Sequence, residues 1–140
     1  MKKMKAYALL FFLPVFFASC EPETKDLFFV DNRSDYEIVV RYVSFYNTPD
    51  AQVKIIPPQM NGLFFDSHNV GEAFDRGNEF LFWFETLTME INDTLIISKD
   101  YMNRSNWTFD ILGGDGGRRD GGFAVYTFTV EPEDIVPAGT

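Results

Sequence analysis

The segment FAVYTFTVE, Phe123 to Glu131, decides the fold class because its side chains alternate along its whole length. One face would carry Ala124, Tyr126, Phe128 and Val130, and the other would carry Phe123, Val125, Thr127 and Thr129. A period of two is the pattern of a β-strand, and β-branched and aromatic residues favour strands. The segment therefore predicts a strand with one strongly apolar face.

The stretch just before this strand holds six of the chain's ten glycines, in GGDGGRRDGG, Gly113 to Gly122. Glycine at this density predicts a mobile loop that joins two strands. Asp115 and Asp120 could also offer oxygens to calcium, and Arg118-Arg119 could contact an acidic partner. The segment lacks the spacing of calcium β-helices, the EF-hand pattern and the Lys-Ser/Thr ending of a phosphate loop. A plain loop is the preferred interpretation.

Further short strands are predicted upstream, each bounded by turn residues. They are Leu27–Asp31, Tyr36–Ser44, Gln52–Ile56, Leu63–Asp66, Glu79–Thr86, Leu87–Ile91, Thr94–Ser98 and Asn106–Leu112. Seven to nine short strands with frequent turns predict an all-β fold, a β-sandwich of immunoglobulin-like or transthyretin-like type. An open β-barrel is the alternative.

Several connections are predicted from the turn residues between these strands. The first two strands are expected to form an opening hairpin, and Asn92-Asp93 is expected to close a two-residue hairpin. Asn47 to Asp50 and Asn61-Gly62 are predicted turns. Residues 67–78 are predicted to form a polar loop, and Lys99 to Ser105 a short helical turn.

The composition is rich in aromatic residues and acidic. The chain has 16 Phe, 6 Tyr and 2 Trp, and its formal net charge is −9. Loss of the first nineteen residues, with their three lysines, would leave nine basic against 21 acidic side chains, a formal charge of −12. Nucleic acid is therefore an unexpected partner, because phosphate binding needs clustered Lys and Arg.

The first nineteen residues have the order of a secretory signal peptide. Lys2, Lys3 and Lys5 give a basic start, the apolar run AYALLFFLPVFF follows, and Ala18 and Ser19 precede Cys20. The apolar run is shorter than the roughly 20 residues of a membrane-spanning helix. Cys20 is the only cysteine, so the chain can form no internal disulfide.

Phe17-Ala18-Ser19-Cys20 resembles the lipobox of bacterial lipoproteins. Together with the acidic start CEPETKD and the closing strand YTFTVEPEDI, the chain resembles small β-rich lipoproteins of the Bacteroidota. The resemblance implies cleavage before Cys20, two or three lipid chains on that residue, and attachment to the outer membrane of the cell envelope, with surface display left open. The expected divisions are a signal peptide (1–19), an acidic tether (20–26), a β-sandwich domain (27–131) and a C-terminal tail (132–140).

The sequence offers few groups for catalysis. His68 is the only histidine, and the run Asp66-Ser67-His68 places the residue types of a triad in adjacent positions, whereas triad partners normally meet across a fold. Glu79, Glu85 and Glu90 could form a pair for glycoside hydrolysis, but acids are abundant throughout the chain. A non-catalytic protein with no cofactor and no metal site is therefore the prediction.

Two tryptophans and one threonine are candidate sites. Trp83 and Trp107 could stack against sugar rings, although core packing is the alternative for both. Thr94, in Asp93-Thr94-Leu95, matches the short O-glycosylation motif of the Bacteroidota. The leading prediction is an envelope lipoprotein, attached through Cys20, that binds a glycan or protein partner. The rival prediction is a structural or assembly subunit that pairs with a neighbour through an edge strand.

Overall fold

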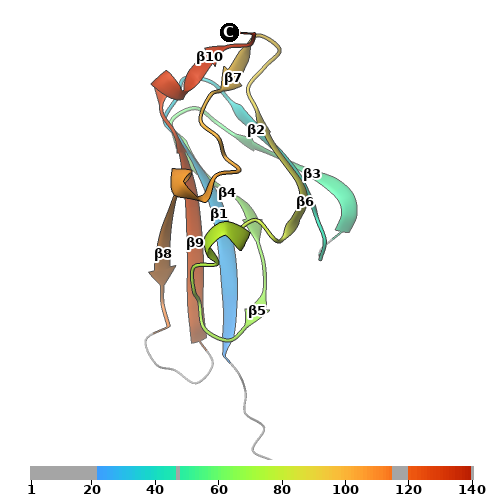
Figure 1. Ribbon diagram of the computed structural model, residues 1–140, viewed down its shortest axis with the longest axis vertical. Helices are drawn as coiled ribbons and strands as arrows, with labels where there is room; N and C mark the ends of the chain where they lie inside the picture. The colour runs from blue at the N-terminus through green and yellow to red at the C-terminus, as the bar shows by residue number, and fades with distance from the viewer. Residues whose placement is uncertain (1–21, 47, 115–119, 140) are drawn as a thin grey trace, which may run out of the picture.

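The last long strand, β9 (Asp120–Val130), lies inside a sheet and buries the face that its alternation predicts. The computed structural model describes residues 22–46, 48–114 and 120–139 (Figure 1). Ala124, Tyr126, Phe128 and Val130 are all fully buried, whereas Phe123 on the opposite face is 36% exposed.

The larger sheet is built around β9. Its order is β4 (Met60–Asp66), β1 (Glu23–Asn32), β9 and β8 (Trp107–Leu112), and the short β5 (Asn69–Val70) also pairs with β1. β1 and β9 run parallel, while the other pairs in this sheet are antiparallel. The two longest strands of the sheet therefore come from opposite ends of the described chain and lie side by side (Figure 1).

A second sheet faces the first, and a two-stranded ribbon lies at one end. The second sheet has the order β3 (Thr48–Ile56), β2 (Ile38–Ser44) and β6 (Phe84–Glu90), and the ribbon pairs β10 (Ile135–Pro137) with β7 (Leu95–Ile97). Three short 3₁₀ turns complete the fold: η1 (Gly77–Glu79), η2 (Arg104–Asn106) and η3 (Pro132–Asp134). The predicted all-β sandwich is confirmed, and the described strands form no closed barrel.

Aromatic rings fill the space between the two sheets. Phe28, on β1, is fully buried and stacks against Tyr126 with ring centroids 5.0 Å apart. It also meets Phe84 of the opposite sheet edge-on at 5.2 Å. Tyr42 of β2 reaches Phe65 of β4 in the same way at 5.6 Å. Such contacts add to the hydrophobic term, so the aromatic composition is accounted for mainly by this core.

The first two strands do not form the predicted hairpin. β1 pairs with β4 and β9, whereas β2 pairs with β3 and β6. The chain changes sheets at the fully buried Asn32, whose amide nitrogen donates to the carbonyls of Tyr36, Ile56 and Pro57 at 2.8, 3.1 and 3.0 Å. A buried amide with all these partners holds two sheet-crossing connections together.

Other predicted connections also differ from the structure. Asn92-Asp93 closes no hairpin, because β6 pairs with β2 and β7 pairs with β10. Thr48–Asp50 belong to β3 instead of a turn, and Asn61-Gly62 lie inside β4. The reversal before β4 occurs instead at Pro58-Gln59, where Gln59 has a φ of 58°.

The predicted tether and tail are both wrong for their described parts. β1 begins at Glu23, so residues 23–26 of the predicted tether are part of the sheet, and Thr24 and Asp26 are buried. Residues 132–137 of the predicted loose tail form η3 and β10, and Ser98 N donates to Asp134 O at 2.7 Å. The polar sequence at both ends suggested solvated segments. In the structure, the backbone hydrogen-bonding groups of these segments pair with segments distant in the sequence.

Candidate functional site

A pocket of about 540 Å³ opens where β4 of the larger sheet ends and β5 begins. Its polar side is formed by Asp66, Ser67, His68, Asn69 and Arg76, and its aromatic side by Tyr46, Phe82 and Trp83. These residues come from the end of β4, the link to β5, the residues after β2 and the loop before β6. We call this the Arg76 pocket.

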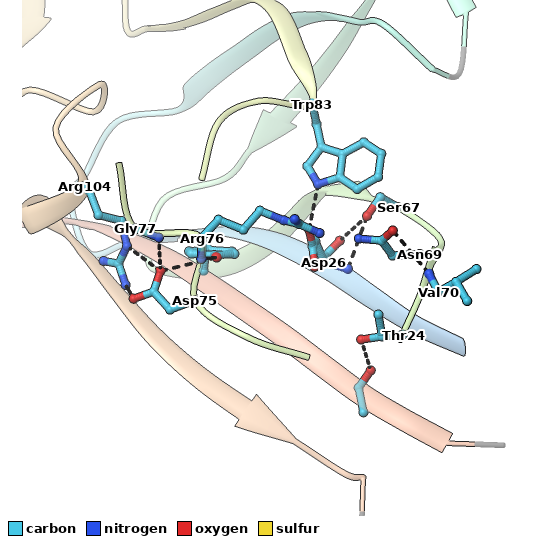
Figure 2. Close-up of polar contacts among 12 residues, drawn as sticks. Thr24, Asp26, Ser67, Asn69, Val70, Asp75, Arg76, Gly77, Trp83 and Arg104 are labelled. Carbon is cyan, nitrogen blue, oxygen red and sulfur yellow. Dashed lines mark hydrogen bonds and ion pairs between the residues drawn. The ribbon is translucent and has the colours of Figure 1, made fainter. Parts of the chain in front are cut away.

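A buried carboxylate lies behind the Arg76 pocket. Asp26 is 2% exposed, and its Oδ2 accepts hydrogen bonds from Arg76 Nε and from the indole Nε1 of Trp83, both at 2.7 Å. Figure 2 shows Arg76 and Trp83 converging on this one carboxylate. A buried charge is tolerated when it is paired and hydrogen-bonded, and Asp26 meets both conditions.

Aromatic rings surround the guanidinium of Arg76. Its Cζ lies 4.4 Å from the ring centroid of Phe82, 4.9 Å from that of Phe74 and 5.7 Å from that of Trp83. These distances fall within the range of cation–π attraction, which is stronger where the cation is partly desolvated. The Arg76 side chain is 15% exposed, so the rings and Asp26 fix its position.

A second polar cluster holds the backbone of the Arg76 loop. Arg76 N donates to the hydroxyl of Tyr126 at 2.9 Å, and Asp75 pairs with Arg104 and accepts from Gly77 N at 2.9 Å. The hydrogen bond from Arg104 holds the pKa of Asp75 below its usual value. Burial raises the pKa of the Tyr126 phenol. Figure 2 shows this cluster next to the Asp26 contacts.

Ser67 joins the end of β4 to β1. Its backbone N donates to Asp26 O at 3.0 Å, and Asp26 N donates to Ser67 Oγ at 3.2 Å. Ser67 is 3% exposed and His68 is exposed, as a loop histidine would be. The Ser67 hydroxyl is therefore occupied by the backbone of the neighbouring strand and helps to position Asp26.

The three aromatic side chains that line the pocket differ in how exposed they are. Tyr46 is 64% exposed and meets Trp83 edge-on at 5.0 Å, while Phe82 is half-buried and lies 4.3 Å from Trp83. Trp83 itself is 6% exposed. The ring surface that a ligand could contact therefore belongs mainly to Tyr46 and Phe82, with Trp83 behind them.

Trp83 occupies this place because residues 79–83 do not form the predicted strand. Phe80 N donates to Gly77 O and Phe82 N donates to Glu79 O, at 3.2 and 3.0 Å, and β6 begins only at Phe84. Successive turns of this kind bring residues three apart to the same side. Phe80 and Trp83 therefore both point inward, which the period-two interpretation did not predict.

Trp107 is not available for a ligand, and its prediction as a sugar-binding residue is wrong. It is 4% exposed, and its indole N–H donates to Tyr101 O at 2.7 Å. Its ring lies 5.3 Å from Phe128 and 5.4 Å from Phe80. The alternative weighed from the sequence, core packing, is what the structure shows.

The remaining predicted sites have different outcomes. Thr94 is exposed, and its hydroxyl donates to Asn92 Oδ1 at 2.9 Å, so its glycosylation stays a prediction. Cys20 and residues 115–119 of the glycine-rich loop lie outside the described residues. The sequence reasoning missed Asp26, Arg76, Tyr46 and Phe82. Residues 23–26, Glu-Thr-Lys-Asp, carry no apolar alternation, so no local signal in the sequence placed them in β1.

The part of the chain that the structure describes contains no group of three or more His, Cys, Asp or Glu placed to hold a metal ion. Nor does any helix there have the length and apolar character needed to cross a bilayer.

Comparison with known proteins found no match to any family model, curated protein or solved structure. The immunoglobulin-like or transthyretin-like subtype and the resemblance to lipoproteins of the Bacteroidota therefore stay predictions.

Proposed function

We propose that this chain is a non-catalytic binding module of the cell envelope and that the Arg76 pocket binds a saccharide. The observation that carries the proposal is the pairing of two accessible rings, Tyr46 and Phe82, with polar groups in one concave site. A volume of about 540 Å³ is within the range of small-ligand sites.

The two sides of the pocket suit the two kinds of surface on a sugar. The apolar face of a sugar ring packs on an aromatic ring, while its hydroxyls need donors and acceptors. Asp66 at the end of β4, His68 in the link and Asn69 at the start of β5 line the pocket and offer both. A site of this kind fixes the orientation of a ligand by hydrogen bonds and gains affinity from the rings.

A glycan array tests this proposal. Replacing Tyr46 or Phe82 with alanine is expected to weaken binding by about two- to tenfold, since each removes ring contact worth roughly 0.5–1.5 kcal/mol. Tyr36→Ala is the matched control, because Tyr36 is 44% exposed and does not line the pocket. Equal loss in Tyr46→Ala and Tyr36→Ala, or no glycan bound by the wild type, would count against the proposal.

The proposed membrane attachment rests on the resemblance of residues 17–20 to a lipobox. A lipid on Cys20 would be attached three residues before Glu23, so at most about 10 Å of extended chain would separate it from β1. The domain would then stand close to the leaflet, with β7, β10 and the C-terminus at its far end (Figure 1). Labelling cells with a clickable fatty acid tests this, and label retained after Cys20→Ala would contradict it.

A second candidate function is assembly through an edge strand. β3 is an outer strand of nine residues, and its Val53 and Ile55 are 47% and 56% exposed. An edge of this length can pair with a strand of another chain. Light scattering over a range of concentrations tests this function, and Val53→Lys should abolish any oligomer that uses the edge.

A further inference from the structure

We propose that the ligand of the Arg76 pocket is an acidic saccharide, whose carboxylate is bound by the guanidinium of Arg76. This inference rests on the proposed function and names the class of sugar that the pocket selects. The feature that points to it is a positioned arginine with part of its donor set unused by the protein.

Arg76 uses its inner nitrogen for the fold. Nε donates to Asp26, and across the described residues neither terminal nitrogen has a hydrogen bond to the protein. No fully buried side-chain nitrogen or oxygen in the described chain lacks a partner. The two terminal nitrogens therefore reach solvent, and Arg76 meets solvent where it lines the pocket.

The position of the guanidinium is set before any ligand binds. Asp26 holds one end, and Phe74 and Phe82 lie 4.9 and 4.4 Å from Cζ. A planar guanidinium recognises a carboxylate by two parallel hydrogen bonds, and a side chain that is already fixed loses little entropy on binding. Arg76 thus has the geometry of a preorganised carboxylate receptor.

The charges around Arg76 limit where a carboxylate can lie. Asp26 is buried behind the guanidinium, on the side away from solvent. Asp66 is exposed and lines the same pocket. It would repel a carboxylate placed near it and would instead accept hydrogen bonds from sugar hydroxyls. A uronic acid carries a carboxylate for Arg76 and hydroxyls for Asp66 on one ring. The same ring has an apolar face that can pack on Tyr46 and Phe82.

The test compares oligogalacturonides with their methyl esters, by isothermal titration against the wild-type protein. The ester keeps the ring and its hydroxyls but removes the charge. We expect the acid to bind about tenfold or more tightly, since hydrogen bonds to charged groups contribute roughly 1.5–3 kcal/mol. Equal affinity for acid and ester would overturn this inference and leave the proposed function standing. If neither form bound and the array showed no bound glycan, both this inference and the proposed function would be overturned.

Variants then assign the selectivity to Arg76. Arg76→Lys keeps a charge but loses the planar fork, so the ratio of acid to ester affinity should fall. In the charge-neutral pair Asp26→Asn/Arg76→Gln, which leaves no unpaired buried charge, the ratio should approach one. Arg41→Gln is the control, because Arg41 is 52% exposed outside the pocket, and it should keep the wild-type ratio. A folded double variant with the wild-type ratio would refute the role of Arg76.

Discussion

Replacing Arg76 with methionine is expected to destabilise the fold by about 3 kcal/mol. Breaking a buried ion pair costs roughly 3–5 kcal/mol, because the remaining charge is left buried without its partner. Asp26 is 2% exposed and would keep one charge-neutral donor, the indole of Trp83. Arg76 is 15% exposed, which lets water reach the site and places the expectation at the lower end of that range.

Urea denaturation followed by tryptophan fluorescence measures this change. Adding Asp26→Asn to Arg76→Met should restore stability to within about 1 kcal/mol of wild type, since the double variant buries no unpaired charge. Arg41→Met is the control: the Arg41–Glu90 pair is 3.5 Å long and more than half exposed on both sides. It should cost less than about 1 kcal/mol. The reasoning would be refuted if Arg76→Met cost no more than Arg41→Met. It would also be refuted if the effects of Arg76→Met and Asp26→Asn on stability were purely additive.

Three further predictions concern packing and pH. Gly121→Ala should destabilise the fold by about 1–3 kcal/mol in urea, because a Cβ there would clash with the backbone oxygens of Gly71 and Glu23. Burial raises the pKa of Tyr42, so its contribution to stability is complete below pH about 10 and is lost as pH rises further; Tyr42→Phe should flatten that alkaline decline in melting temperature. The lowered pKa of Asp75 gives stability above pH about 4 that is lost as pH falls, and Asp75→Asn should reduce the acid dependence.

The strand-rich fold could be predicted because the relevant patterns are local. Alternation in residues 123–131 and in Tyr36–Ser44 reports which face of a strand is buried, whatever the strand pairs with. The structure confirms both strands, with β2 beginning at Ile38. The sandwich class follows from the number and spacing of such segments.

The pairing of strands could not be predicted in the same way. Parallel pairing of β1 with β9 joins residues about a hundred positions apart, and no local pattern encodes it. The polar sequence of residues 23–26 looked like a solvated tether, yet Asp26 is buried because Arg76 and Trp83 meet it from another loop. The candidate site is made of such long-range contacts, so Trp83 was found from its residue type and Asp26 was not.

The most direct test of the Arg76 pocket as the binding site is a titration of ¹⁵N-labelled protein with oligogalacturonide, followed by NMR. The account predicts that the largest shifts fall on the indole N–H of Trp83 and on the amides of His68 and Asn69, which line the pocket. Shifts confined to Val53 and Ile55 on the β3 edge, or no shifts at millimolar ligand, would contradict it.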